Sequence, residues 1–375
     1  MYRMVYPYLG EFGRGMGVEL AEFSRAFTLR SIAGGLAPIL AFLADSRGRK
    51  AGMLFGLALI IPGAGLLVVW PTFQVFVLSM VIATVGYHVF VPSMQAYLGD
   101  EVPYQQRGLV LAVTEIGWSL SFIAGVPLVG ILIMRFGWTS PYPIFVVLGM
   151  IGFLALARLL PAGALRPGPN RGVRHSLGLV LTSKAALAGL GMSALMTTAN
   201  EMVNLVFGLW LDQAFNLKIA ALGGVAIAVG IAELGGEVLV GGLVDRLGKV
   251  RAVAVGFLLN SLAALAFLGI GSSQVGAVLV LVAFFLTFEF TLVSSLPLMT
   301  EILPSARATL MAVNIALFAL GRALGALLGA WLYGRGGELL PQIGPNAIAA
   351  VAFNLLALLG LALLRRWWQS DAHAP

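Results

Sequence analysis

Six ionisable side chains interrupt long apolar stretches of the sequence. They are Arg30, His88, Glu201, Glu233, Glu289 and Arg322. At the centre of a lipid bilayer a charged side chain costs about 2.5–3.5 kcal/mol, so such residues face a helix-bundle interior or a watery cavity. Carboxyl, guanidinium and imidazole groups can bind a charged substrate or carry a proton. They can equally form structural ion pairs, such as Glu289 with Arg322 or Arg30 with an acidic partner. The sequence therefore predicts a polar site inside an apolar bundle.

The composition indicates a polytopic membrane protein. Apolar residues make up 59% of the chain and charged residues 10%, against about 45–50% and 25% in soluble domains. The net charge of +7 lies in short loops rather than on one basic face, so no nucleic-acid partner is expected. The chain has no cysteine. It also shows no phosphate-binding glycine loop, catalytic triad or metal-ligand cluster, so we expect neither an enzyme nor a cofactor or metal.

Stretches long enough for membrane helices, about 20 apolar residues each, recur along the chain. We expect them at 20–44, 51–70, 73–99, 108–134, 141–160, 185–211, 219–243, 252–270, 275–302, 308–333 and 345–364. An apolar and aromatic fragment, MYRMVYPYLG, precedes them. Residues 161–184 are rich in Pro, Gly and Arg and read as a hydrophilic linker between two halves, 1–160 and 185–375.

Most Lys and Arg residues outside the spans fall in loops on the linker's side of the membrane. This bias places the linker and the C-terminus in the cytoplasm. The sequence RRWW at 365–368 is typical of an interfacial anchor. We therefore expect a multi-pass protein of the cell membrane.

The two halves repeat each other at an offset of 200 residues, since 245 − 45 = 200. The matched pairs are Asp45 with Asp245, Gly48 with Gly248, Glu101 with Glu301, and Arg107 with Arg307. An even number of spans in each half makes these parallel repeats of six helices. The same offset puts the start of the first span before Met1, so MYRMVYPYLG would be its outer half and EFGRGMGVE the first outer loop. The alternative is a protein of eleven spans with an outer N-terminal stub.

Two loops carry a family resemblance. ADSRGRK (44–50) and VDRLGKV (244–250), within AFLADSRGRK and GGLVDRLGKV, resemble the loop signature of the major facilitator superfamily. GVPLVG at 125–130 resembles a degenerate form of that family's antiporter motif, whereas Ile82 stands where proton-coupled members carry a fourth-span Arg. The resemblance implies an all-α fold of two six-helix pseudo-repeats. It also implies a secondary transporter that works by alternating access, more often an exporter.

In this family, spans one, four, seven and ten line the central cavity. The resemblance therefore nominates Tyr87, His88, Asn200, Glu201, Asn204 and Glu289. Glu201 and Glu289 are the candidate proton carriers. Glu233 on span eight is a third, expected behind the cavity-lining helices, and Arg30 and Arg322 are candidates for an anionic substrate.

The repeated loops are predicted to act as cytoplasmic latches. Asp45 would meet the N-terminus of span eleven near Ser305–Ala308, and Asp245 the start of span five near Gln106–Leu109, because a carboxylate stabilises a helix N-terminus. Gly48 and Gly248 would make tight turns. The remaining motif residues, Arg49, Lys50, Arg246 and Lys249, would hold the loops at the membrane surface. The alternative is that these loops are topology signals only.

Small residues recur every four positions on two spans, at Gly321, Gly325 and Gly329 and at Gly117, Ser121 and Gly125. Such faces allow close helix contact, either at a moving interface or in ordinary packing. We expect a monomeric transporter of a small molecule, with protons as one coupling alternative and uniport as the other. A non-transporting membrane sensor or an inactive truncated copy is the alternative from another class.

Overall fold

The computed structural model describes residues 1–36, 39, 48–101, 117–161, 173–337 and 340–372, and these residues form helices and turns without a strand. The first half contains η1 (Tyr2–Val5), α1 (Leu9–Met16), α2 (Leu20–Gly35), α4 (Arg49–Val69), α5 (Phe73–Glu101), the π-helical η2 (Ser121–Gly125), α7 (Val126–Phe136) and α8 (Pro141–Leu159). The second contains α9 (Val173–Thr182), α10 (Lys184–Asn204), α11 (Phe207–Phe215), α12 (Ile219–Leu247), α13 (Lys249–Ala266), η3 (Phe267–Gly269), α14 (Gln274–Ile302), η4 (Pro304–Ala306), α15 (Arg307–Leu332) and α16 (Gly344–Ala372).

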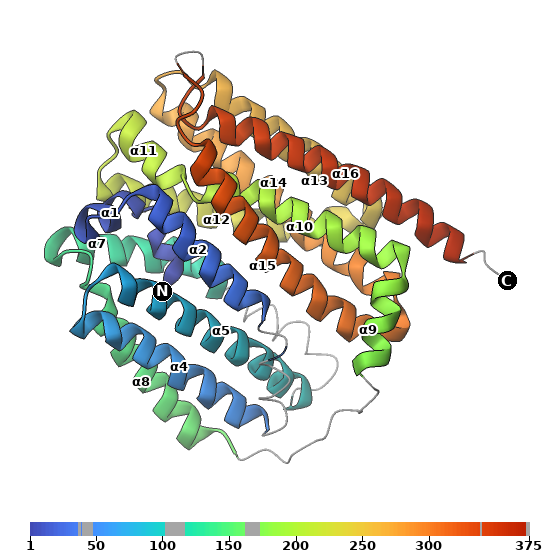
Figure 1. Ribbon diagram of the computed structural model, residues 1–375, viewed down its shortest axis with the longest axis horizontal. Coiled ribbons are helices and arrows are strands. Elements are labelled where there is room, and N and C mark those ends of the chain that lie inside the picture. The colour runs from blue at the N-terminus through green and yellow to red at the C-terminus, as the bar shows by residue number, and fades with distance from the viewer. Residues whose placement is uncertain (37–38, 40–47, 102–116, 162–172, 338–339, 373–375) are drawn as a thin grey trace.

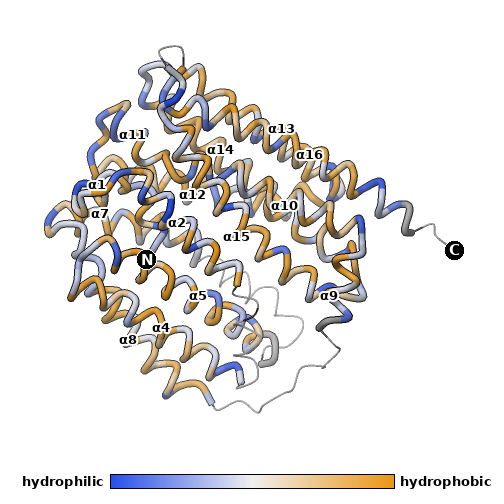
Figure 2. Tube along the Cα trace, viewed as in Figure 1, coloured by the Kyte–Doolittle hydropathy of each residue, from blue (hydrophilic) through white to orange (hydrophobic). Residues whose placement is uncertain are grey.

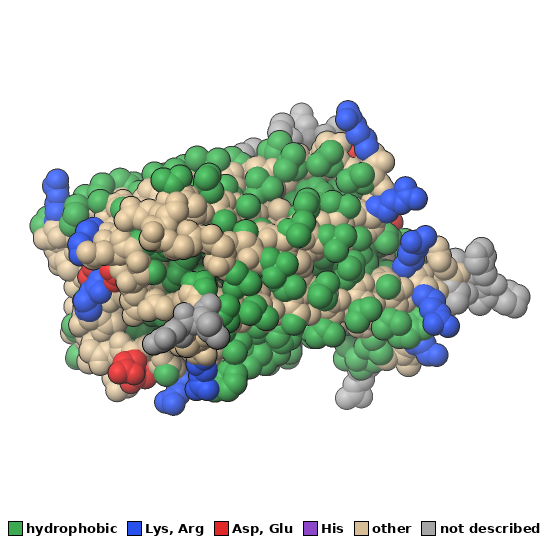
Figure 3. All heavy atoms as spheres, turned by 90° about the horizontal axis from the view of Figure 1, so that it is seen from above, with side chains coloured by type: hydrophobic (Ala, Val, Ile, Leu, Met, Phe, Trp, Pro, Cys, Tyr) green, Lys and Arg blue, Asp and Glu red, His purple; other side chains and the backbone are tan. Residues whose placement is uncertain are grey.

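The described part of the chain has 9 helices long and apolar enough to cross a membrane, or 10 if a pair bent by 80° between α9 and α10–α11 counts as one span. They coincide with the predicted spans except the one at 20–44, whose described part is α2, Leu20–Gly35, with 16 residues too short to be counted. For example, the span expected at 73–99 is α5, Phe73–Glu101. Apolar residues run along these helices (Figure 2), and Figure 3 shows hydrophobic side chains across the middle of one face with Lys and Arg at its two ends.

The helices pack as two bundles that meet along two matched seams (Figure 1). In the first bundle α4 packs on α5 and α8, and in the second α10 packs on α15 and α16 while α14 packs on α12 and α13. Between the bundles, α2 lies against α15, and α7 with η2 lies against α12. These seams join span two to span eleven and span five to span eight, as a two-fold repeat requires.

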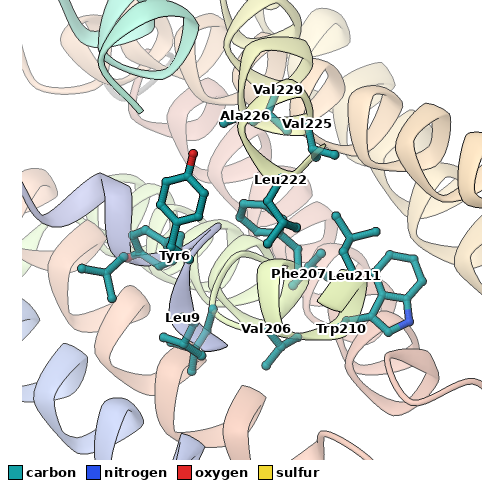
Figure 4. Close-up of a cluster of buried hydrophobic side chains, with 14 of the residues drawn as sticks. Tyr6, Leu9, Val206, Phe207, Trp210, Leu211, Leu222, Val225, Ala226 and Val229 are labelled. Atoms are coloured by element: carbon teal, nitrogen blue, oxygen red, sulfur yellow. The ribbon is translucent and has the colours of Figure 1, made fainter. Parts of the chain in front are cut away.

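The N-terminal segment is buried in the seam between the bundles. Tyr6 and Leu9 lie against apolar residues of α10–α12, among them Val206 and Phe207 (Figure 4). The predicted outer loop EFGRGMGVE is wrong in part, because α1 continues to Met16 before Gly17 ends it at φ +68°. Phe12 is fully buried on this helix, and that burial stabilises the extra turns.

The linker region 161–184 also differs from a purely solvated connector. Its second part forms α9, which packs against α15 and η4. Val180 on this helix is fully buried in an apolar cluster. Apolar residues at Leu177, Val180 and Leu181 follow helical spacing, which the Pro and Gly content of the earlier part masks.

The glycine stripe of α15 packs within the second half, so it serves tight packing rather than the interface between halves. A Cβ added at Gly321 would lie 2.3 Å from the Ala194 carbonyl oxygen, and one at Gly325 would lie 2.6 Å from that of Thr198. Both neighbours belong to α10. Around Gly117 and Gly125 an added Cβ meets nothing within 4 Å in the described residues.

Candidate functional site: a charged cavity between the halves

A partly open cavity lies between the two bundles. Eight predicted residues line it: Arg30, Tyr87, His88, Asn200, Asn204, Glu233, Glu289 and Arg322. Glu233 thus faces the cavity instead of standing behind it. Glu201 lies in the adjoining wall and is 1% exposed. The N-terminal segment adds Tyr2, Arg3 and Tyr6, which the sequence did not single out.

Glu201 is held by three side chains from three helical segments. It accepts hydrogen bonds from the Tyr6 hydroxyl at 2.7 Å and from Asn204 Nδ2 at 3.0 Å. Arg322 Nη1 lies 3.5 Å from its second oxygen. Arg322 therefore pairs with Glu201 on α10, whereas the sequence suggested Glu289 as its partner. Because the α15 glycines bring α10 and α15 into close contact, this pair forms across one tight helix interface.

Arg3 ties the N-terminal segment to the second half. Its Nη2 donates to both carboxylate oxygens of Glu233, at 2.7 and 2.6 Å. Its Nη1 donates to the Trp118 carbonyl at 2.7 Å and to the Ser121 hydroxyl at 3.2 Å. The guanidinium carbon also lies 4.1 Å and 3.9 Å from the ring centroids of Trp118 and Phe122, a cation–π geometry. Both terminal nitrogens of Arg3 therefore have hydrogen-bond partners. The sequence signal that could have identified Arg3 as a cavity residue was its position on the first span, which was predicted to line the cavity.

Glu289 differs from both paired carboxylates. It is 8% exposed on α14, and no hydrogen bond or ion pair to it appears among the described residues. The charges that act on it come from Glu233 and Glu237 on α12, from Arg3 and from Arg322. This carboxyl group faces a cavity without a fixed partner.

Arg30 is the corresponding unpaired cation. It is 6% exposed, and within the described ranges its Nε and Nη1 have no hydrogen-bond partner. Its guanidinium carbon lies 4.1 Å from the Tyr2 ring centroid and 5.3 Å from that of Phe27. The acidic partner considered from the sequence is absent from the ion pairs of the described residues. Nearby, His88 Nδ1 lies 2.9 Å from the Thr84 carbonyl oxygen.

The repeated loops share a backbone geometry. Gly48 and Gly248 adopt φ of +96° and +79° and precede α4 and α13, as predicted for tight turns. Lys50 Nζ donates to the carbonyls of Ala157 and Leu160, and Lys249 forms an ion pair with Glu301. Arg307 Nε donates to the carbonyl of Thr300 at 2.8 Å.

Other parts of the predicted latches cannot be placed. Asp45, Arg107 and the side chain of Glu101 lie outside the described residues, as does the segment Gln106–Leu109 expected to meet Asp245. Asp245 and Arg246 are exposed. The latch contacts of both aspartates therefore stay predictions.

The end of the cavity predicted to face outward is closed by contacts between the halves. Ser24 on α2 donates to the Ala326 carbonyl on α15 at 2.9 Å, and Thr28 to that of Ala323 at 3.3 Å. At the surface, Arg14 Nη1 forms an ion pair with Asp212 at 2.8 Å. These bonds join spans one and two to spans seven and eleven on that side.

Comparison with known proteins agrees with this architecture. The family model for the Major Facilitator Superfamily matches residues 1–296. The inner membrane transport protein YdhP of Escherichia coli (strain K12) is 26% identical over 389 residues, covering 96% of this chain and 94% of YdhP. The MFS-type transporter YtbD of Bacillus subtilis (strain 168) is 24% identical, covering 88% and 82%.

Solved structures share the fold at low sequence identity. A variant of the nucleoside transporter NupG superposes with a TM-score of 0.78 at 13% identity, covering 96% of each chain. A D-xylose-proton symporter gives 0.74 at 15% identity, covering 97% of this chain and 95% of the symporter. With matched seams, a cavity between two helix bundles and a family match over most of its length, the chain belongs to the Major Facilitator Superfamily and is a multi-pass secondary transporter.

Proposed function

We propose that this transporter exports a small molecule by alternating access in exchange for protons, with Glu289 as the proton-binding group. One observation carries the proposal: a carboxyl group without a partner faces a cavity lined by both halves. Burial disfavours the charged form of a carboxyl group, and nearby positive charge favours it. Tilting of the halves changes the water around Glu289 and its distance from Arg3, which belongs to the other half. The group can then take up a proton on one side and release it on the other.

Glu201 is the weaker candidate of the two predicted carriers. Both its oxygens are engaged by Tyr6, Asn204 and Arg322. A carboxylate that accepts several hydrogen bonds is stabilised in its charged form, which suits a structural role. Glu233 is engaged in the same way by Arg3.

The direction and the topology are part of the proposal. Export is supported by GVPLVG at 125–130, which resembles an antiporter motif, and this segment contributes to the α7–α12 seam. We assign the α1 end to the outside and the linker and C-terminus to the cytoplasm, on the distribution of Lys and Arg. The protein would work as a monomer, because each chain contains both halves of its cavity.

The test is flux in proteoliposomes of purified protein, with a compound panel and an imposed pH gradient. Exchange is supported if transport follows the pH gradient and if protons move against the substrate, so that the compartment the substrate leaves becomes more acidic. Flux that is identical at every pH gradient, and unaltered when protons equilibrate freely, would contradict coupling and favour uniport. Vesicles of mixed orientation, treated on one side with an impermeant thiol reagent against an engineered cysteine, separate export from import.

A further inference from the structure

Among the described residues, four buried hydrogen-bond donors without partners belong to side chains that line the cavity. They are Nε and Nη1 of Arg30, Nδ2 of Asn200 and Oγ1 of Thr84, and all three residues line the cavity. Arg30 is 6% exposed and Asn200 and Thr84 are each 3% exposed. A buried donor left unsatisfied costs about 1–3 kcal/mol, and more when the donor is charged. Several such donors around one cavity indicate that the cavity binds a molecule with hydrogen-bond acceptors.

The aromatic neighbours of Arg30 leave these donors free to bind. Cation–π contact uses the flat face of a guanidinium, and the Tyr2 ring centroid lies 4.1 Å from its central carbon. The N–H bonds lie in the guanidinium plane, so a ring against its flat face does not occupy them. Stacking thus fixes the orientation of Arg30 while leaving it hydrogen bonds to donate.

The charges around the cavity divide it into two ends. Arg30 and Arg322 share one carboxylate, Glu201, whose oxygens already accept bonds from Tyr6 and Asn204. At the other end Glu289 and Glu233 share Arg3, with Glu237 nearby, and Arg322 acts on this end as well. The Arg30 end is therefore the more positive of the two and the Glu289 end the more negative.

We infer that Arg30 and Asn200 bind an anionic group of the transported molecule, a carboxylate or a phosphate. Such a group accepts hydrogen bonds only, supplies the missing charge and matches a set made of donors. Hydrogen bonds between charged groups in a dry site are about twice as strong as neutral ones. The inference rests on the proposed function, whose substrate class it names. A small organic anion would bind here while Glu289, at the opposite end, handles the proton.

Binding to the purified, detergent-solubilised protein tests this without any need for transport. Thermal-shift measurements would compare matched pairs of probes: benzoate with benzamide, phenyl phosphate with phenol, and succinate with succinamide. We expect stabilisation by at least one anion and by none of the neutral partners. Equal stabilisation by the neutral or by cationic probes would overturn the inference, even if proteoliposomes show transport. Stabilisation by dihexanoyl phosphatidylglycerol alone would assign the site to lipid and overturn it as well.

Variants identify the residues. Arg30→Gln should weaken anion binding at least tenfold, and Arg30→Lys should retain part of it. Asn200→Asp should abolish binding by placing a carboxylate where the anion sits, whereas Asn200→Ala should weaken it less. Arg25→Gln is the matched control, because Arg25 is an exposed arginine on the same helix. Undiminished anion binding in both Arg30→Gln and Asn200→Asp would overturn the assignment.

Discussion

Two arginines that line the same cavity differ in their hydrogen-bond partners. Arg3 donates to Glu233, to Ser121 and to the Trp118 carbonyl and lies between two aromatic rings. Arg30 is the more deeply buried of the two, yet its Nε and Nη1 donate to no group among the described residues. Burial alone therefore does not tell a structural charge from a functional one. We propose that the number of donors left unsatisfied makes this distinction.

The carboxylates divide in the same way. Glu201 and Glu233 are bound by side chains of the N-terminal segment. Glu289 has charged neighbours but no hydrogen bond within the part of the chain that the structure describes. Arg3, Glu201 and Glu233 thus hold the cavity together. Arg30 and Glu289 are the groups that we propose bind the substrate and the proton.

The largest expected effect is the difference in stability between a variant that lacks Arg3 and one that lacks Arg30. Arg3→Met strands Glu233 without its partner, and losing one member of a buried pair costs about 3–5 kcal/mol. Arg30→Met strands no carboxylate and should cost less than about 1 kcal/mol of the free energy of unfolding. Thermal unfolding of the purified proteins compares them. The double variant Arg3→Met/Glu233→Leu should recover most of the loss, and equal losses in the two single variants would contradict the distinction.

The second prediction concerns the two carboxylates. Glu289→Gln keeps the side-chain shape but cannot titrate, so transport driven by a pH gradient should fall at least tenfold while exchange at equal pH survives. Glu201→Gln, the matched control, should keep its response to the gradient and lose thermal stability instead, because its contact with Arg322 weakens. Proteoliposome flux with and without a gradient measures this. A normal gradient response in Glu289→Gln would exclude Glu289 as the coupling group.

The third prediction tests what holds Glu201 in its engaged position. A Cβ at Gly325 would lie 2.6 Å from the Thr198 carbonyl oxygen and 2.8 Å from Glu201 Cβ. Gly325→Ala should therefore separate α15 from α10 and cost about 1–3 kcal/mol, the usual range for overpacking. Gly224→Ala is the control, since nothing lies within 4 Å of its added Cβ. If both alanine variants unfold at the temperature of the parent, close packing does not fix Glu201.

Sequence reasoning succeeded where chain position alone decides the outcome. Hydrophobic runs set the spans, and the 200-residue offset marked Gly48 and Gly248, which take the same positive-φ turn. Depth in the membrane also follows from position, so most of the predicted charges do line the cavity. These features depend on distances along the chain.

The sequence could not predict which charged side chains contact each other, because these contacts depend on the direction of side chains around each helix. One residue step turns a side chain by about 100°, so an error of one position moves a group to another neighbour. That is why Arg322 was assigned to Glu289 although it contacts Glu201. The roles of Arg3 and Tyr6 were missed because their partners lie 230 and 195 residues away. No local pattern reports such contacts.

The smallest expected effect lies at the surface, where Arg14 and Asp212 join the halves at the end of the seam that we propose faces outward. Arg14 is 58% and Asp212 16% exposed in this pair, and exposed pairs contribute about 0.2–1 kcal/mol. Arg14→Gln should therefore favour opening on this side only modestly, with a rise of up to about fivefold in the outside labelling of a Ser24→Cys probe, since Ser24 lies buried at the α2–α15 seam. The increase should shrink at high ionic strength, because salt screens exposed charges.

Arg135→Gln removes another exposed arginine of the same side, one without an ion pair among the described residues, and should leave labelling unchanged. Equal labelling in both variants and the parent would mean that the seam is held by Ser24, Thr28 and apolar packing, and that paired charges matter only inside the cavity.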